Sequence, residues 1–431
     1  MAQRYDTYKD SGVQWLGEIP RHWNCTSLGR VLSEKLQYGA SESGDLECTN
    51  NSMRYIRITD ITLDGKLKPD GCKYLSSEVG RNYPVKKGDV LLARSGATVG
   101  KAFIYNEDND ACYAGYLIKA SVQQEKVSPQ FFFYFTQTSQ YDEWKNRIFI
   151  QATIQNISAE KYARMSLCIP PLSEQHSIVS YLDDKCGKID KMLEGKQKQI
   201  ELLAEMKQRI IADAVTRGLN PDVKMKATNI PWLPEIPEHW EAQRMATLFT
   251  GDIEINKDFE YKRAFKFNYG QLVPKNEIGE PEDYREVYVK YSKIKQGDIL
   301  VNGLNLNYDF ISQRVACAPS DGIITSAYVV CRPRKDVNYE YYTYLFKGMD
   351  SMKLFHGMGT GIRLTLSFKE MKKQILPIPP HSEQHDIVSY IKERSAKIDI
   401  LTSKLQQEIE SIKEYKQRLI SDVVTGQIKV C

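Results

Sequence analysis

The sequence contains no apolar run long enough to cross a membrane, and its first residues, MAQRYDTYKDSG, are polar instead of forming a secretory signal. None of its nine cysteines lies in a CxxC pair, so mostly reduced, buried thiols are expected. Charge of one sign is also scarce, because the net charge is only +4 over 431 residues. The composition therefore predicts a soluble cytoplasmic protein, long enough for two or three domains with real cores.

Motifs for catalysis or nucleotide binding are missing as well. The stretch SGATVGKA (95–102) has one residue too few between its glycines for a phosphate loop, and Ala102 stands where a magnesium-binding Ser or Thr belongs. HGMGTG (356–361) does not follow an apolar strand of a βαβ unit, so a flexible loop is expected there. Neither a paired-carboxylate site nor a nucleophile–base set can be identified. Both Pro-Pro steps lack the acid or amide and the aromatic residue of an amino-methyltransferase motif.

His381 and His385 in HSEQH are four residues apart, as two metal ligands on a helix can be. However, the first copy of the same motif has Leu172 in place of His381, and His381 is expected to precede the helix. We therefore predict no catalytic residue, no metal and no cofactor in this chain.

The sequence does contain a long internal repeat. IPPLSEQHSIVSYL begins at Ile169, and its near-copy IPPHSEQHDIVSYI begins 209 residues later at Ile378. The same offset relates KKGDVLL to KQGDILV, and WLGEIPRHW recurs as WLPEIPEHW. This pattern predicts a tandem duplication, in which each half has a start motif, about 150 residues of mixed character, a Pro-Pro stop and a helix.

The repeated Pro-Pro-x-Ser-Glu-Gln stretch predicts the boundary between a globular region and a helix. Proline cannot continue a strand and keeps the residue before it extended. Ser173 and Ser382 occupy positions expected for N-caps, and Glu174 and Glu383 place an acid in each first helical turn.

Heptad spacing predicts that each helix is long, about 38 residues, and belongs to a coiled coil. Met192 and Met206 widen the apolar stripe of the first helix, and Leu401 and Tyr415 flank that of the second. Residues 174–218 and 383–431 each contain eight acidic and eight basic residues, so neither helix carries net charge. The predicted coiled-coil seam consists of Leu182, Ile189, Leu203, Ile210, Ile391, Ile398, Leu405, Ile412 and Leu419.

Connectivity predicts that the two helices pair antiparallel. A short linker leads from the first helix into the second globular region, whose end starts the second helix, and domain termini often lie close together. The expected result is a rod of about 57 Å with a pseudo-two-fold axis and one globular region at each end.

The globular regions show short alternating strands, such as RYIRITDI and AYVVCRP, and few helical signals. They predict an α+β fold with mostly antiparallel sheet and long loops. Because the helices are neutral, the positive excess lies mostly in these regions and suits an elongated polyanion.

The start motif YKDSGVQWLGEIPRHW, its echo, and the repeated IPP-SEQ--IVSY followed by KID and KQRLISDVVTG closely resemble the specificity subunit of type I restriction–modification systems. The resemblance covers essentially the whole chain. It implies a non-catalytic subunit with two target-recognition domains, each of which reads one half of a split, asymmetric double-stranded DNA sequence. The helices would set the gap between the half-sites.

The same resemblance implies the partners. Two methyltransferase subunits would methylate adenine N6 with S-adenosylmethionine, and two restriction subunits would supply ATP-driven translocation and nuclease activity. S-adenosylmethionine, ATP and Mg²⁺ would then be bound by those partners. The expected segments are a start motif (1–23), the first target-recognition domain (24–171), helix one (172–219), a linker with the repeated start motif (220–240), the second target-recognition domain (241–380), helix two (381–426) and a tail (427–431).

Polar loop residues are the expected readers of base edges, because Arg matches guanine, Asn and Gln match adenine, and Tyr stacks or binds phosphate. The start motifs and helix starts, shared by both halves, are expected to dock the methyltransferase subunits through Trp15, Trp23, Trp232 and Trp240. Two alternatives remain open: a coiled-coil scaffold that does not bind DNA, and a self-contained methyltransferase or nucleotide-dependent nuclease. The candidate DNA-binding residues are Arg94, Ser95, Thr98, Lys101, Gln151, Thr153 and Gln155 in the first half, and Asn302, Asn305, Asn307, Thr360 and Arg363 in the second.

Overall fold

The computed structural model describes residues 3–430, except 46–47, 63–66, 69, 97, 151–154, 310–312 and 360–363. The chain divides into two compact units, which are treated separately below. Unit 1 is Met1–Lys196 together with Gln407–Cys431, and unit 2 is Gln197–Gln406. No helix among the described residues is long and apolar enough to span a membrane.

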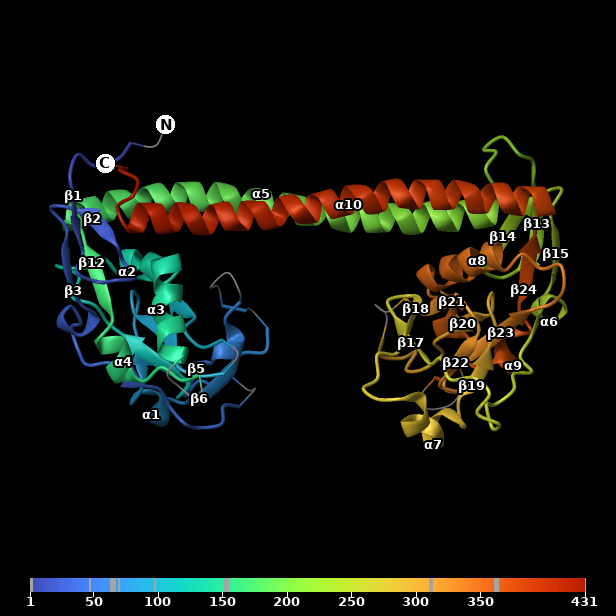
Figure 1. The fold of residues 1–431 in the computed structure, drawn as a ribbon, viewed down its shortest axis with the longest axis horizontal. Helices are drawn as coiled ribbons and strands as arrows, with labels where there is room; N and C mark the ends of the chain where they lie inside the picture. The colour runs from blue at the N-terminus through green and yellow to red at the C-terminus, as the bar shows by residue number, and fades with distance from the viewer. Residues whose placement is uncertain are drawn as a thin grey trace. The chain divides into compact units, whose positions relative to one another are not determined.

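Unit 1 is built on two four-stranded sheets, with strand orders β6-β5-β10-β7 and β4-β11-β8-β9, and two two-stranded pairs, β1-β2 and β12-β3 (Figure 1). All these pairings are antiparallel except that of β10 with β5. The strands are β1 (Tyr8–Asp10), β2 (Glu18–Pro20), β3 (Asn24–Ser27), β4 (Gln37–Tyr38), β5 (Ser52–Ile56), β6 (Lys73–Ser76), β7 (Pro84–Val85), β8 (Val90–Ala93), β9 (Ala102–Ile104), β10 (Ala111–Tyr113), β11 (Leu117–Ala120) and β12 (Ser166–Ile169). The short helices are α1 (Ser77–Gly80), α2 (Pro129–Phe135), α3 (Ser139–Ile150) and α4 (Ala159–Ala163).

Unit 2 has a related plan, with one four-stranded sheet in the order β16-β23-β20-β21. Its other strands form the two-stranded pairs β13-β14, β15-β24, β17-β18 and β19-β22. All these pairings are antiparallel. Its strands are β13 (Met225–Ile230), β14 (Leu233–Pro237), β15 (Glu241–Arg244), β16 (Phe249–Thr250), β17 (Phe265–Asn268), β18 (Gln271–Pro274), β19 (Ser292–Ile294), β20 (Ile299–Val301), β21 (Val315–Cys317), β22 (Gly322–Ile324), β23 (Val329–Pro333) and β24 (Ile375–Ile378). Its short helices are α6 (Met245–Leu248), α7 (Arg285–Tyr288), α8 (Tyr339–Ser351) and α9 (Phe368–Met371). The predicted α+β class with mostly antiparallel sheet is confirmed in both units.

The repeated Lys-x-Gly-Asp sequence forms the same turn in both units, directly before β8 and before β20. In each turn the Asp side chain accepts the backbone N–H of the Lys three residues earlier, at 2.7 Å in residues 86–89 and at 2.8 Å in residues 295–298. Gly88 and Gly297 have φ angles of 92° and 85°, which only glycine adopts without strain. Both strands that follow are fully buried, so the turn fixes where the central strand of each sheet begins.

The two long helices are α5 (Leu172–Arg217, 46 residues) and α10 (His381–Val424, 44 residues). Both are longer than the expected 38 or so residues, because helical turns precede and follow the regular heptads. Ser173 and Ser382 are each the second residue of their helix, so the N-cap prediction is wrong for both, and His381 lies inside α10. The glycines after the helix ends, Gly218 and Gly426, both have φ of 75°, as a helix C-terminus requires.

Within each unit, segments of α5 and α10 are joined by ion pairs. In unit 1 the partners on α10 descend in number as those on α5 ascend, so the two segments run antiparallel. The pairs are Asp190–Lys416 (2.6 Å) and Lys196–Glu408 in unit 1, and Lys207–Asp399 (2.7 Å) in unit 2.

Every residue of the predicted seam is at least partly buried. Leu182, Ile391, Ile398 and Leu419 are at most 6% exposed, and the other five are half-buried. The flanking residues differ from expectation, since Met192 (54% exposed), Met206 (49%), Leu401 (49%) and Tyr415 (58%) face solvent. The apolar stripe is therefore narrower than the sequence pattern predicts.

Cys25 and Cys168 face each other across β3 and β12 and form a disulfide, so the expectation of reduced thiols is wrong for this pair. The corresponding positions in unit 2 are Ala242 and Pro377, which also face each other across two strands. Cys112, Cys186, Cys317 and Cys331 form no disulfide, and burial raises the pKa of Cys112 to about 11.

Candidate nucleic-acid interface

The Glu of the first Ser-Glu-Gln motif holds the start motif of unit 1 onto the first turn of α5. One carboxylate oxygen of Glu174 accepts the indole N–H of Trp23 at 3.1 Å, and the other lies 2.8 Å from Nε2 of His22. The hydroxyl of Tyr5 also donates to Glu174. Because the carboxylate lies in the first turn of a helix, the helix dipole favours its negative charge there.

Unit 2 contains the same arrangement at the start of α10. Glu383 accepts the indole N–H of Trp240 at 2.9 Å and lies 2.7 Å from Nε2 of His239. Trp240 also packs closely against Gly218, which directly follows α5. We call these two Glu–Trp–His clusters the helix-start junctions. They explain why His-Trp and Ser-Glu-Gln recur together in both halves.

The Gln of the motif ties the helix start to the globular part of its unit. The side-chain N–H groups of Gln175 donate to the carbonyls of Lys126 and Pro170, both at 2.9 Å, and its oxygen accepts the N–H of Ser128 at 2.8 Å. Gln384 donates in the same way to the carbonyl of Pro379 at 2.8 Å. The Gln of the repeated motif therefore connects the start of each long helix to the globular part of its unit by hydrogen bonds.

Burial decides what the predicted docking tryptophans can do. Trp23 and Trp240 are fully buried, at 0% exposure, so their rings offer no exposed surface to a docking partner. Trp15 and Trp232 are only half-buried. Direct docking through the start motifs thus stays a prediction for these two.

In unit 1 the structure brings the two predicted groups of DNA-binding residues together. The loop between β8 and β9 (94–101) contains Arg94, Ser95, Thr98 and Lys101, which are all half-buried. Ser95 forms a β-bridge with Asn156, and the N–H of Ile157 donates to the carbonyl of Arg94 at 2.9 Å. Gln155 is therefore next to the β8–β9 loop and is exposed, whereas Gln151 and Thr153 lie outside the described residues.

Arg94 is also held by two tyrosines that sequence reasoning missed. Its guanidinium carbon lies 4.8 Å from the ring centre of Tyr38, and its backbone N–H donates to the carbonyl of Tyr116. Tyr38 and Tyr116 are 41% and 66% exposed. An arginine beside an exposed aromatic ring, here that of Tyr38, can contact bases by hydrogen bonding and by stacking. The sequence gives no signal for this cluster, because its members come from separate loops.

In unit 2 the corresponding loop between β20 and β21 (302–314) is organised by one buried arginine. Arg314 is 0% exposed, and its guanidinium donates to the carbonyls of Asn302 (3.0 Å), Leu304 (2.8 Å) and Asp309 (2.5 Å). Its backbone N–H donates to the carboxylate of Asp350 at 2.8 Å. A single side chain therefore fixes the path of residues 302–309 of this loop.

The predicted asparagines lie on this loop in different settings. Asn305 is exposed, with a φ of 51°, and Asn307 is half-buried. The side-chain oxygen of Asn302 accepts the backbone N–H of Leu304 at 3.2 Å, so part of this side-chain amide stabilises the conformation of the loop. Tyr308, which sequence reasoning missed, is 80% exposed. Thr360 and Arg363 lie outside the described residues.

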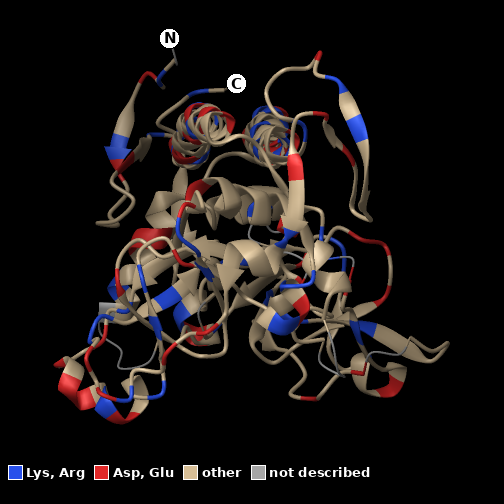
Figure 2. Ribbon diagram, turned by 90° about the vertical axis from the view of Figure 1, so that its right-hand side faces the viewer, with Lys and Arg blue, Asp and Glu red and all other residues tan. Residues whose placement is uncertain are grey.

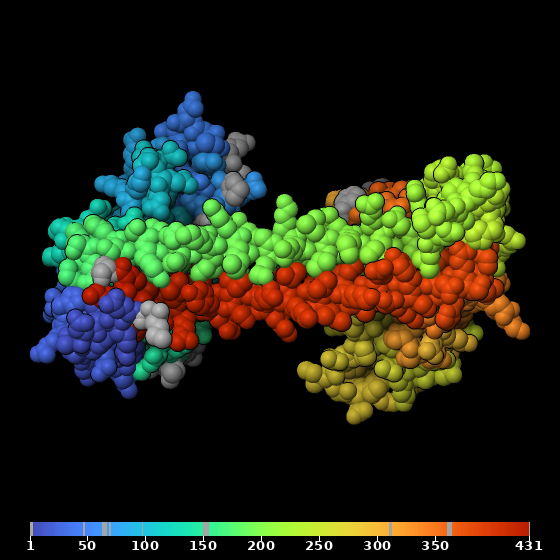
Figure 3. Space-filling view, turned by 90° about the horizontal axis from the view of Figure 1, so that it is seen from above, coloured from blue at the N-terminus to red at the C-terminus, as the bar shows by residue number. Residues whose placement is uncertain are grey.

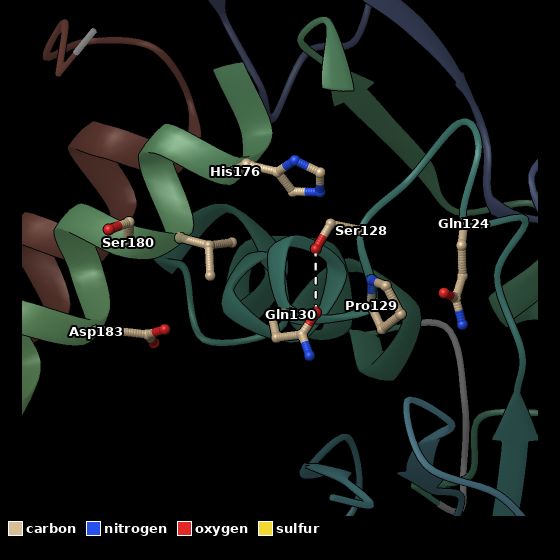
Figure 4. Close-up of a pocket in the computed structure, with 8 residues that line it drawn as sticks. Gln124, Ser128, Pro129, Gln130, His176, Ser180 and Asp183 are labelled. Atoms are coloured by element: carbon tan, nitrogen blue, oxygen red, sulfur yellow. Dashed lines mark hydrogen bonds between the residues drawn. The ribbon is translucent and has the colours of Figure 1, made fainter. Parts of the chain in front are cut away.

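A cleft of about 360 Å³ in unit 1 offers polar groups but no catalytic arrangement. Figure 4 shows His176, Ser180 and Asp183 projecting from α5, with Ser128 and other residues at the start of α2 on the opposite side. Asp183 already accepts the hydroxyl of Tyr134 at 2.5 Å. Within the described residues, no group of three or more His, Cys, Asp or Glu side chains is placed to hold a metal ion.

In Figure 2, Lys and Arg (blue) and Asp and Glu (red) are interspersed along the ribbon. Recognition would have to rest on particular loops, and the β8–β9 and β20–β21 loops occupy the same position in their sheets.

The comparisons with known proteins agree with this architecture. The chain is 22% identical over 439 residues to the type I restriction enzyme EcoBI specificity subunit of Escherichia coli, covering 97% of this chain and 89% of the relative. It is 23% identical to the putative MjaX specificity subunit of Methanocaldococcus jannaschii, covering 96% of each. A solved chain from work on complex assembly and conformational transition of the type I R-M system shares the fold, with a TM-score of 0.67, 15% identity and coverage of 94% of this chain and 98% of that one.

The model of one protein family matches both halves of the chain, over residues 23–202 and 264–411. Its description is the type I restriction modification DNA specificity domain. The chain belongs to this family of DNA specificity proteins.

Proposed function

We propose that this chain is the DNA-specificity subunit of a type I restriction–modification complex and that each unit reads one half of a bipartite, asymmetric DNA site. The observation that carries the proposal is the pair of equivalent loops. Both follow the same Lys-x-Gly-Asp turn and the same central strand, yet 94–101 and 302–314 differ in sequence. A scaffold shared by both units, with different loops, is what two different half-sites require.

The first half-site would be read by the β8–β9 loop together with Tyr38 and Tyr116. Arg94 is the strongest candidate for a base contact, because its guanidinium is oriented by the exposed ring of Tyr38. In unit 2 the equivalent surface would be formed by Asn305, Asn307 and Tyr308.

Arg94→Ala should lower discrimination at one base pair of the first half-site by about 1–3 kcal/mol. Competition binding of the assembled methyltransferase complex to duplexes with single-base changes measures this. Arg81→Ala removes an exposed arginine at the end of α1 and serves as the matched control. Equal weakening on all duplexes would make Arg94 a phosphate contact and not a base reader.

The proposal also assigns the long helices the role of a ruler, which sets the distance between the two half-sites. A coiled coil of α5 and α10, antiparallel along its length, would hold the two recognition units at a fixed separation with a pseudo-two-fold relation. Half-sites read on one face of DNA lie about 34–36 Å apart, and a 46-residue helix is about 69 Å long. The ion pairs and half-buried seam in each unit support this role.

Inserting seven residues after Ile200 in α5 and seven after Lys404 in α10 should lengthen the accepted gap by about three base pairs. Seven helical residues add about 10 Å, and base pairs are about 3.4 Å apart. The methylated motif of each variant gives the gap directly. Seven residues placed after Pro221, in the exposed linker, should leave the gap unchanged. An unaltered gap in the double-helix insertion would rule out the ruler.

The exposed apolar side chains on α5 and α10 support docking of two methyltransferase subunits, to which restriction subunits would attach. Figure 3 shows both helices open to solvent along one face. Leu202, Met206, Ile400 and Leu401, all in unit 2, are 49–58% exposed on these helices. With Trp15 and Trp232, they are the proposed contacts. S-adenosylmethionine, ATP and Mg²⁺ would be bound by the partner subunits, and the complex would function in the cytoplasm.

A DNA-binding measurement distinguishes a specificity subunit from a coiled-coil scaffold that does not bind DNA. The complex with methyltransferase should bind duplex DNA with an affinity that falls steeply with salt, because phosphate contacts release counterions. Filter binding at several salt concentrations measures it. A complex that forms but binds no DNA would be the scaffold.

A further inference from the structure

Unit 2 contains a second, larger cavity that DNA recognition does not use. Its volume is about 460 Å³, within the range of small-molecule sites. Side chains from α5, α8, α10 and the β17–β18 hairpin line it, and Lys207, Tyr344, Lys347, Asp350, Lys392 and Ser395 are among them. All lining residues belong to unit 2.

Lysines dominate the charge of this cavity. Lys207 is paired with Asp399 at 2.7 Å, and Lys392 is paired with Glu340 at 2.5 Å. Lys347 is different, because no hydrogen bond or ion pair from any described residue reaches its ammonium group. Burial and the nearby charge of Lys207 both lower the pKa of Lys347. A half-buried cation that faces another cation would be stabilised by an anion.

Two further polar groups of the cavity lack partners. The hydroxyl of Ser395 and one carboxylate oxygen of Asp350 are buried, and neither forms a hydrogen bond with a described residue. The other oxygen of Asp350 accepts the backbone N–H of Arg314. Since buried unpaired polar groups are rare and costly, these atoms point to a ligand that both accepts and donates hydrogen bonds.

Aromatic side chains complete the cavity. Tyr344 lies in the wall, and Tyr269 stands at the rim on the two-residue turn of the β17–β18 hairpin, 86% exposed and with a φ of 45°. A planar ring can stack on such side chains. Duplex DNA is too wide to enter a cavity of this volume, so the ligand must be small.

We propose that this cavity binds a small organic phosphate of up to mononucleotide size, with its phosphate on Lys347 and Lys207 and its ring near Tyr344 and Tyr269. Lysine ammonium groups bind phosphate as point charges, and a ring amino group would satisfy Asp350. The bound molecule would link α8 and the β17–β18 hairpin to the long helices within unit 2. The proposal does not depend on the DNA-specificity function.

Isothermal titration of the full chain with adenosine 5′-monophosphate (AMP), inorganic phosphate and adenosine tests it. AMP should bind at one site per chain, and adenosine should bind at least about tenfold more weakly, because it lacks the phosphate. Lys347→Gln should weaken AMP binding by about tenfold or more. Lys373→Gln, an exposed lysine of the same unit, should leave AMP binding unchanged.

Thermal unfolding without ligand controls for the fold of the variant. Because no described residue forms a hydrogen bond or ion pair with the Lys347 ammonium group, Lys347→Gln should keep or raise the Tm of the ligand-free chain and lose the Tm increase caused by AMP. The proposal is overturned if neither AMP nor inorganic phosphate binds, if adenosine binds as tightly as AMP, or if Lys347→Gln binds AMP like the original chain.

Discussion

Replacing Arg314 with methionine should abolish discrimination at the half-site read by unit 2 and lower the free energy of unfolding of that unit by about 3–5 kcal/mol. The guanidinium is fully buried and donates to four loop carbonyls. Methionine fills similar space but donates nothing, so those carbonyls and Asp309 would be left without the positive charge that holds them. The loop that carries Asn305 and Asn307 would then lose its fixed path.

Calorimetric unfolding and the methylated motif of the assembled complex measure the two effects of Arg314→Met. Arg244→Met is the matched control, because Arg244 is exposed on β15 and its side chain forms no hydrogen bond or ion pair with a described residue. The first half-site should be read as before, since it belongs to unit 1. Intact discrimination at both half-sites would show that the β20–β21 loop does not read DNA.

Trp23→Ala should lower the free energy of unfolding of unit 1 by about 3–5 kcal/mol. The ring is 0% exposed in the core of that unit, and its N–H is bonded to Glu174. The truncation creates a cavity and leaves a largely buried carboxylate with one donor fewer. Trp23→Phe retains most of the volume and removes only the donor, so a smaller loss of about 1–3 kcal/mol is expected.

Calorimetric thermal unfolding of the original chain, Trp23→Ala and Trp23→Phe gives the order of their stabilities. Trp15→Ala is the control within the same start motif, because Trp15 is only half-buried and bonds to no carboxylate among the described residues. Equal losses for Trp15→Ala and Trp23→Ala would contradict the assignment of Trp23 as the centre of the helix-start junction.

The organisation of the chain could be predicted because it is repeated. Heptads in two copies indicated both long helices, and the offset of 209 residues indicated two similar units. The sequence predicted Ser173 and Ser382 as N-caps, but each helix begins one residue earlier. A sequence pattern shows which residues are favourable caps, but not which backbone carbonyl accepts the first helical hydrogen bond. The length was underestimated because only regular heptads were counted.

The candidate site was less predictable, because its parts meet through long-range contacts. The two groups in unit 1 were chosen separately, and only the fold shows that Ser95 pairs with Asn156. Nothing in the sequence around Arg314 distinguishes a buried organising arginine from an exposed base reader. Similarly, Trp23 and Trp240 stand in polar segments, so their complete burial could not be read from sequence.

The central claim is that each unit reads one half of a split DNA site. Co-expression with a methyltransferase subunit, followed by sequencing of host DNA for N6-methyladenine, tests it most directly. We predict a bipartite motif, methylated on both strands, with one fixed gap, in which Arg314→Met alters only one half. A stable complex that methylates no such motif, or a motif whose two halves change together, would contradict the account.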